Sequence, residues 1–397
     1  PTFSLIALAV VMGFLHYRLG WRLGPLTAVS FLAVLALTFG GLQVPVMGVS
    51  ANTWRWVLLA YALAASLLPV WLLLQPRDFL NSLLLYLALA SIIVGLFLLN
   101  PGFAAPAFNP DPEGAPSMIP FLFIIIACGA VSGFHAVVAS GTTARQLDKE
   151  PDARMVGYGG MIGESFLALI AVLATTAGFS SFSAWEDHYA SWSAGSGLGA
   201  KLGAFIHGTG LFIHSWGVPQ QFAEAFVSVV VVAYALTSVD SGTRLLRYNL
   251  HEIGATFNLR ILENRWVATL LAVAAIGFFA FFQVNGKPAG LHLWALFGTT
   301  NQILAALTLL AVSAYLFHMR RPVIYTVLPM ILVLTATVMA MVYNLADYIA
   351  KGNWALTIVG GIILVLALWV VLEGVSMVRA NREKRRAEAA AVSGEGS

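Results

Sequence analysis

The stretch 80–99, LNSLLLYLALASIIVGLFLL, carries no charged residue over its whole length. A helix of about 20 predominantly apolar residues is long enough to cross the ~30 Å hydrocarbon core of a bilayer. Arg77 stands just before this stretch, where a membrane helix is expected to meet water. We therefore expect residues 80–99 to form one transmembrane helix.

Ten further segments share this pattern, so the sequence predicts eleven spans in one all-α helical bundle. Cytoplasmic loops collect Lys and Arg, and 17 of the 21 basic residues fall in every second gap between the segments. The others are Arg55, Lys201, Lys287 and Lys351. This alternation predicts a cytoplasmic C-terminus. The segments are 2–16, 25–42, 56–74, 80–99, 118–139, 157–178, 219–238, 266–284, 291–316, 323–343 and 354–374.

The composition also indicates a membrane protein. Hydrophobic residues make up 59% and charged residues 10% of the chain, whereas soluble domains contain about 25% charged residues. The predicted domains are a transmembrane domain over 1–378 and a disordered cytoplasmic tail over 379–397. Residues 202–218 are short for a span and break at Pro219, which favours a re-entrant or interfacial segment. Because the chain starts at Pro1 inside an apolar run, we expect further sequence upstream.

Three ionisable residues inside the expected spans are candidates for proton coupling: His135, Glu164 and Glu224. A charged group in the bilayer costs about 2.5–3.5 kcal/mol on insertion scales, so each one needs a reason. His135 and Glu164 approach the cytoplasmic side from adjacent spans and could share one proton as a coupled pair. The alternative for each is a structural hydrogen bond between helices. Asp240 is expected to pair with Arg244, one turn further along.

Two polar stretches are candidates for substrate binding. Residues 140–143 end the fifth expected span, where a glycine can open the helix and expose carbonyls and hydroxyls. The alternative is close helix packing by small residues, which also suits the glycine-rich stretch 157–163. The amides at 301 and 302 lie inside an apolar segment and either join helices or line a cavity. The candidate residues are Ser140, Gly141, Thr142, Thr143, Asn301 and Gln302.

No motif indicates a metal, a cofactor or an enzyme. His207 and His214 could share a helical face, but no third metal ligand stands near them in the sequence. Cys128 is the only cysteine, so no disulfide framework exists within this sequence. Metalloprotease, hydrolase, phosphate-loop and CxxC motifs are absent. Because there is no phosphate loop, we expect any uphill transport to use an ion gradient.

Five blocks of the sequence stand out together: LLLQPRDFLNSLLLY (72–86), SGFHAVVASGTT (132–143), GYGGMIGESF (157–166), TSVDSGTRLLRY (237–248) and LFGTTNQILAAL (296–307). In this order they closely resemble the carbon starvation protein A family. The resemblance implies a secondary transporter of the bacterial inner membrane that takes up pyruvate or short peptides. It implies H⁺ as the coupling ion, with Na⁺ as the alternative. It also implies a five-plus-five inverted-repeat fold with further N-terminal spans before the part seen here.

The leading hypothesis is therefore a gradient-driven symporter in the lipid bilayer. The alternatives are a passive channel or a non-transporting membrane sensor, and a membrane-embedded enzyme ranks third. A channel would show a ring of filter residues and a sensor a folded output domain, and the sequence shows neither. The positions that the resemblance carries over are His135, Ser140, Thr142, Thr143 and Glu164, followed by Asn301 and Gln302.

Overall fold

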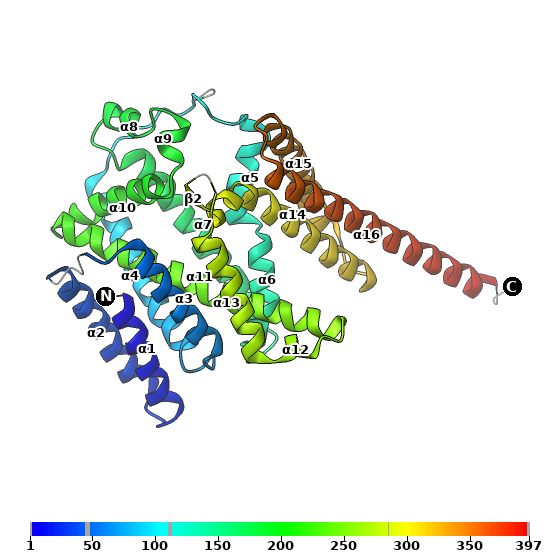
Figure 1. Cartoon of the computed structure of the whole chain (residues 1–397), viewed down its shortest axis with the longest axis horizontal. Helices are drawn as coiled ribbons and strands as arrows, with labels where there is room; N and C mark the ends of the chain where they lie inside the picture. The colour runs from blue at the N-terminus through cyan, green and yellow to red at the C-terminus, as the bar shows by residue number, and fades with distance from the viewer. Residues whose placement is uncertain (1, 44–47, 110–112, 285, 395–397) are drawn as a thin grey trace. The chain divides into compact units, whose positions relative to one another are not determined.

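The computed structural model describes residues 2–43, 48–109, 113–284 and 286–394, and these are almost wholly helical (Figure 1). Their one strand pair joins β1 (Gln283–Val284) and β2 (Lys287–Pro288). The helices are α1 (Thr2–Tyr17), α2 (Leu23–Gln43), α3 (Ala51–Leu67), α4 (Leu74–Leu99), α5 (Met118–Ala130), α6 (Gly133–Gly141), the 3₁₀ turn η1 (Thr143–Arg145), α7 (Asp152–Ala177), α8 (Phe182–His188), α9 (Trp192–Ser196), α10 (Leu198–His214), α11 (Gln220–Thr256), α12 (Arg260–Glu263), α13 (Arg265–Phe281), α14 (Ala289–His318), α15 (Ile324–Ala350) and α16 (Trp354–Gly394).

Within the described residues, seven helices are long and apolar enough to cross a membrane: α2, α4, α7, α11, α14, α15 and α16. Two shorter helices, α1 and α13, are also apolar and contain 16 and 17 residues. The prediction of a helical membrane protein is confirmed, and the chain is an all-α, multi-pass membrane protein. The count of eleven spans and their orientation stay predictions.

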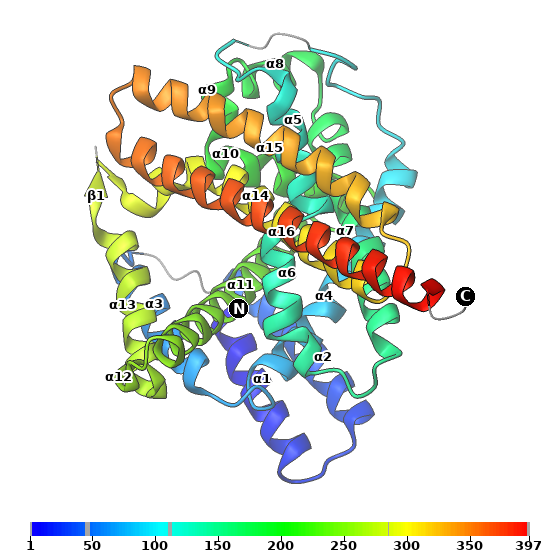
Figure 2. The same cartoon turned by 90° about the vertical axis from the view of Figure 1, so that its right-hand side faces the viewer.

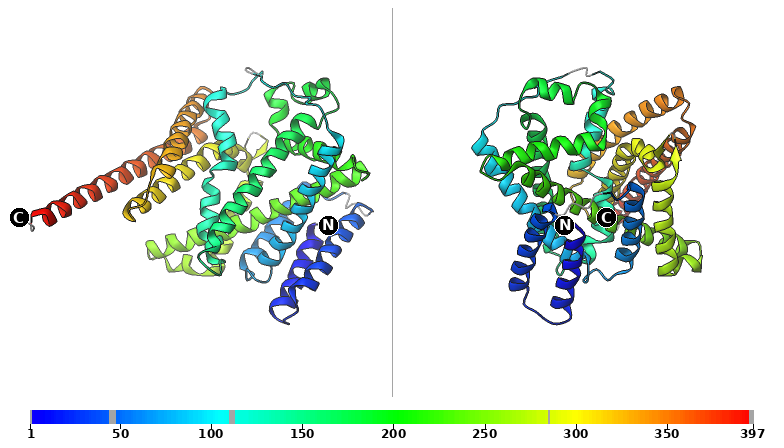
Figure 3. Two further views of the ribbon diagram at one scale, coloured as in Figure 1. Left: turned by 180° about the vertical axis from the view of Figure 1, so that it is seen from behind. Right: turned by 60° about the vertical axis from the view of Figure 1, so that its left-hand side comes forward.

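The chain folds into two units, and each is described by itself. Unit 1 comprises Pro1–Ala115 and Tyr158–Phe281. In it α1 and α2 pack together as a helical hairpin, drawn in blue in Figure 3, and α10 packs against α4 and α11. A Cβ atom built on Gly95 would lie 1.8 Å from the carbonyl oxygen of Phe212, so only glycine lets α4 approach α10 this closely. The core of the unit includes Leu5, Leu80, Ile170, Phe212 and Val227.

Three helices of unit 1, α3, α4 and α11, differ in their bounds from the predicted spans. α3 ends at Leu67, because the next residue precedes Pro69 and takes an extended conformation. α4 then begins at Leu74, which puts Arg77 inside the helix rather than in a loop. α11 continues to Thr256, well past the predicted end at residue 238. Charged residues mark the end of an apolar run in the sequence, but in α4 and α11 the helix continues through them.

Unit 2 comprises Pro116–Gly157 and Phe282–Ser397. α14, α15 and α16 lie side by side in it, in yellow, orange and red in Figure 2. α5 packs against α14 and α15, and α6 packs against α14. The predicted single span 118–139 is therefore two helices, with Val131 and Ser132 between them.

Two further predictions concern the segments 202–218 and 379–397. α10 covers most of the first, and Pro219 is the N-cap of α11, so the chain breaks where the sequence predicts. Whether this segment is re-entrant or interfacial stays a prediction. α16 continues as a helix to Gly394, while residues 395–397 and the side chains from 377 onward lie outside the described residues. A disordered cytoplasmic tail also stays a prediction.

Candidate functional site

The break between α5 and α6 is held together by side chains of unit 2. The first N–H groups of a helix have no partner within the helix. Asn301 of α14 supplies one, because its Oδ1 accepts from the backbone N–H of Phe134 at 2.8 Å and from the hydroxyl of Ser132 at 3.1 Å. Ser132 is the N-cap, and its Oγ accepts from the N–H of His135 at 3.5 Å. The break is thus a capped helix start rather than a frayed one.

Gly133 brings the start of α6 directly onto α14. A Cβ atom at this position would lie 2.5 Å from both the carbonyl oxygen of Asn301 and the Cβ of Leu304. No side chain fits in that space. By contrast, no described atom lies within 4 Å of a Cβ built on any glycine of 157–163, so the packing role considered for that stretch is not seen. Close packing by glycine belongs to the helix break instead.

Gln302 is the polar side chain of a cavity beside this break. The cavity has a volume of about 220 Å³ and is otherwise lined mainly by hydrocarbon. Gln302 is 0% exposed, and neither its Oε1 nor its Nε2 has a hydrogen-bond partner in the described structure. The two neighbouring amides therefore differ: Asn301 caps a helix, whereas Gln302 lines a cavity. The lining residues are Phe123, Ile124, Ile126, Ala130, Val131, Gln302, Pro329, Leu332, Val333, Ala336 and Thr337.

Residues 140–143 form the end of α6 and the start of η1. α6 ends at Gly141, within the stretch where the sequence predicts a helix end, and the chain has a further break at Val131 and Ser132 that was not predicted. Ser140 donates its hydroxyl to the carbonyl of Val137 within the same helix. Thr142 is 8% exposed, and its Oγ1 has no hydrogen-bond partner among the described residues.

A carboxylate and an imidazole meet in unit 1, between α10 and α11. Oε1 of Glu224 lies 3.0 Å from Nδ1 of His207 and accepts from Nε2 of Gln220 at 2.9 Å. The side chains of His207 and Glu224 are 52% and 32% exposed. A Cβ atom on Gly210 would lie 2.6 Å from Cγ of Glu224, so the glycine makes room for the carboxylate. A pair in this geometry can share and exchange one proton.

His135 and Glu164, the pair expected from the sequence, belong to different units. His135 lies in the first turn of α6 in unit 2, and Glu164 lies on α7 in unit 1. Both side chains have interaction partners. Their pairing with each other stays a prediction. The sequence analysis missed His207 as the partner of Glu224, although His207 precedes Glu224 in an adjacent helix and was considered only as a metal ligand.

A buried ion pair in unit 1 was also missed. Arg77 of α4 and Asp240 of α11 are 1% and 0% exposed and form a salt bridge. Tyr61 of α3 donates its hydroxyl to the same carboxylate oxygen at 2.8 Å. Nearby, Asn81 donates to the hydroxyl of Thr237 at 3.1 Å. Arg77 is visible in the sequence as a charged residue beside a predicted span. It was counted as part of a solvated loop, so no buried partner was expected for it.

Arg244 does not pair with Asp240 as predicted. It donates to the carbonyl oxygens of Ala65 and Leu68 at 2.7 and 2.9 Å, at the end of α3. Arg247 donates to the neighbouring carbonyl of Ser66, and Arg265 to that of Leu67. The last carbonyls of a helix lack N–H partners and carry partial negative charge. These three arginines therefore serve a structural role at one helix end.

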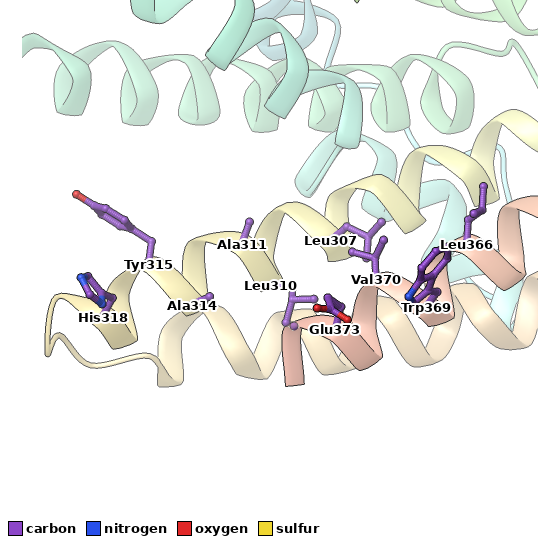
Figure 4. Close-up of a pocket in the computed structure, with 11 residues that line it drawn as sticks. Leu307, Leu310, Ala311, Ala314, Tyr315, His318, Leu366, Trp369, Val370 and Glu373 are labelled. Carbon is purple, nitrogen blue, oxygen red and sulfur yellow. The ribbon is translucent and has the colours of Figure 1, made fainter. Parts of the chain in front are cut away.

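A second cavity, of about 880 Å³, lies between α14 and α16 in unit 2 (Figure 4). Leucine, alanine, valine and tryptophan side chains make up most of its lining, with Tyr315, His318 and Glu373 as its polar side chains. In Figure 4, His318 stands at one end of the cavity and Glu373 lies farther along it. All of its described lining residues come from α14 and α16 and none from the α5–α6 break, so we assign no substrate to it.

No group of three or more His, Cys, Asp or Glu residues in the described ranges is placed to hold a metal ion. The candidate functional features are thus the capped helix break with its Gln302 cavity in unit 2, and the His207–Glu224 pair in unit 1.

The model of the family described as "Carbon starvation protein CstA" matches residues 2–183 and 188–340. The chain is 30% identical over 390 residues to a "Peptide transporter CstA" of Helicobacter pylori, covering 84% of this chain and 57% of that protein. It is 35% identical over 318 residues to a "Peptide transporter CstA" of Mycobacterium tuberculosis, covering 66% of this chain and 42% of that protein. It is 28% identical over 421 residues to the "Pyruvate/proton symporter BtsT" of Escherichia coli, covering 85% and 58%.

The chain thus spans roughly half the length of these relatives, between 42% and 58%. Their names describe transporters rather than enzymes. No solved structure matches the chain.

Proposed function

Because this chain belongs to the carbon starvation protein CstA family, we propose that it forms part of a secondary active transporter for pyruvate or short peptides, driven by the proton gradient. Relatives carry both substrate names, and one of them is named as a proton symporter. The bacterial inner membrane is the proposed location, with the C-terminus in the cytoplasm. The proposed fold has eleven spans in this chain and an inverted repeat.

The interrupted α5–α6 helix is the observation that supports this proposal. Backbone that leaves a helix inside the bilayer needs protein or a water-filled cavity around it. Transporters place their substrate sites at such discontinuous helices. Here the break is capped by Asn301 and adjoins the cavity of Gln302. We propose that substrate binds at this break, in contact with Gln302, and that Ser140–Thr143, at the other end of α6, contact substrate at a separate point of its path.

Asn301 has a different part in this proposal. Its Oδ1 is already engaged by Phe134 and Ser132. It therefore acts by holding the start of α6 in place beside the cavity. Gly141, at the C-terminal end of α6, is proposed to contribute its backbone to substrate binding.

Proton coupling is proposed for Glu224, with His207 as its partner. The carboxylate is 32% exposed, and the imidazole lies 3.0 Å from it, close enough to exchange a proton. Glu164 and His135 remain further candidates for the proton path. A carboxylate that is protonated on one side of the membrane and deprotonated on the other links proton flow to substrate movement.

Uptake into proteoliposomes tests the proposal. The full-length protein is reconstituted, an inward proton gradient is imposed, and labelled pyruvate or a labelled dipeptide is followed with and without a protonophore. We expect accumulation that the protonophore abolishes. Glu224→Gln should lose accumulation but keep exchange of labelled for unlabelled substrate. Glu252→Gln, at an exposed carboxylate of the same helix, is the matched control.

Two outcomes would contradict the proposal. Uptake that the protonophore does not affect would favour Na⁺ coupling or a passive channel. Accumulation by Glu224→Gln at the wild-type level would remove the proton role of this residue.

A further inference from the structure

The cavity beside the helix break has very little polar chemistry. Of the described side chains that line it, only Gln302 and Thr337 carry polar atoms. Thr337 already donates its hydroxyl to the carbonyl of Val333 at 2.6 Å. No charged side chain is among the described lining residues. Any polar group that enters therefore depends on Gln302.

Gln302 is unusual because both ends of its amide are unused. A buried donor or acceptor without a partner costs about 1–3 kcal/mol, and here Oε1 and Nε2 both lack one in the described structure. Asn301 next to it is fully committed to the cap of α6. The cost at Gln302 is removed when a ligand offers one donor and one acceptor together.

The geometry of a primary amide selects the form of that ligand. Its carbonyl oxygen and one of its N–H bonds point to the same side. A protonated carboxyl group presents an O–H and a C=O in the same way, so the two groups form a pair of parallel hydrogen bonds. An ionised carboxylate has no donor for Oε1, and its burial without a cation is costly.

We propose that Gln302 binds the carboxyl group of the substrate in its protonated, neutral form, so that a proton enters the cavity on the substrate itself. This inference rests on the proposed function. It also gives pyruvate and short peptides one shared recognition element, because both carry a carboxyl group. The proton comes from water before binding and returns to water on release, while Gln302 changes neither its charge nor its covalent structure.

Equilibrium binding without any gradient tests this inference on the full-length protein in nanodiscs. Pyruvate, pyruvamide and methyl pyruvate compete against labelled pyruvate over a series of pH values above the pKa of pyruvic acid. We expect the apparent affinity for pyruvate to fall about tenfold per pH unit, because the neutral acid becomes scarcer by that factor. Pyruvamide keeps a donor and an acceptor on one side, so it should compete with an affinity independent of pH. Methyl pyruvate has no donor and should compete far less.

Variants separate Gln302 from other titrating groups. In Glu224→Gln the pH dependence of pyruvate binding should persist, since the titrating proton is on the ligand. Gln302→Met keeps the side-chain length without hydrogen-bonding groups and should abolish the binding of labelled pyruvate, whereas Gln221→Met, at an exposed glutamine, should not. The comparison of the three ligands uses the unmodified protein, so its result does not depend on whether any variant folds.

Pyruvate binding that is independent of pH, or pyruvamide that fails to compete, would overturn the inference. If proton-driven uptake is still observed in that case, the proposed function stands and only the neutral-carboxyl mode is wrong. If the protein takes up neither substrate, the proposed function itself fails.

Discussion

Asp240 of α11 is completely buried and accepts a hydrogen bond from Arg77 of α4, a residue 163 positions away in the sequence. Tyr61 of α3 donates to the same carboxylate. Three helices of unit 1 are therefore joined at one charged point. In a low-dielectric interior each charge depends on the other, because neither has water to replace its partner.

Removing one partner of this pair should be far more harmful than removing both. Arg77→Met leaves the Asp240 carboxylate buried without its cation and is expected to lower the free energy of unfolding by about 3–5 kcal/mol. Asp240→Leu should cost less, because Arg77 keeps its salt bridge to Asp78 at 3.3 Å. The double variant should be much closer to wild type, since two apolar side chains replace the pair. Thermal unfolding of purified protein in detergent, analysed as a double-mutant cycle, measures the coupling.

Lys351→Gln is the control for that experiment. Lys351 and Asp347 form an exposed pair one turn apart on α15, with side chains 70% and 51% exposed. Such a pair contributes only about 0.3–0.5 kcal/mol. Single variants at Arg77 that unfold no more easily than Lys351→Gln would show that the buried pair contributes little to stability.

The cap of α6 by Asn301 should contribute measurably to stability. Asn301→Ala removes the acceptor for the N–H of Phe134 and the hydroxyl of Ser132. Loss of a helix cap costs about 0.5–2 kcal/mol, and we expect a corresponding fall in the unfolding temperature. Thr300→Ala on the same helix loses only a hydroxyl that donates to the backbone carbonyl of Leu296 within that helix. Equal effects of the two substitutions would argue against the cap.

Gly133→Ala should disturb the helix break itself. The new methyl group would lie 2.5 Å from the carbonyl oxygen of Asn301, so α6 must move away from α14. Overpacking of this kind costs about 1–3 kcal/mol, and substrate binding at the adjoining cavity should weaken as well. Gly159→Ala, where no described atom lies within 4 Å, is the matched control and should be tolerated in both assays.

Gly210→Ala should alter proton coupling without removing an ionisable group. Its methyl group would lie 2.6 Å from Cγ of Glu224 and must displace that side chain from His207. We expect slower proton-driven uptake and a shifted pH profile, with exchange preserved. The same change at Gly203 of the same helix meets no described atom within 4 Å. A pH profile in Gly210→Ala identical to that in Gly203→Ala would contradict the assigned role of Glu224.

Much of the fold could be predicted from the sequence. Seven helices long and apolar enough to span a membrane lie within predicted segments or overlap them, because span formation depends on local length and hydropathy. Glu224 and the amides at 301 and 302 could be identified as candidate site residues for a similarly local reason. Polar groups inside an apolar run are costly, so each indicates a partner or a ligand.

Which residues contact one another across helices could not be predicted from the sequence. A helix end was predicted at residues 140–143, where α6 does end, but the break at Val131 and Ser132 was not predicted. What stabilises it there is Asn301, 167 positions from Phe134 in the sequence. Likewise, Arg77 and Arg244 were counted as residues of solvated loops, whereas the structure buries both inside a helical unit.

The sequence by itself thus determined that this chain crosses a membrane repeatedly as helices, since hydrophobic length is a property of each segment alone. Only the tertiary structure decided that Asn301 is a cap while Gln302 faces a cavity, and that Glu224 meets His207 rather than another base. Those distinctions depend on which groups lie within hydrogen-bonding distance across neighbouring helices, and a distance of about 3 Å between remote residues is set by packing.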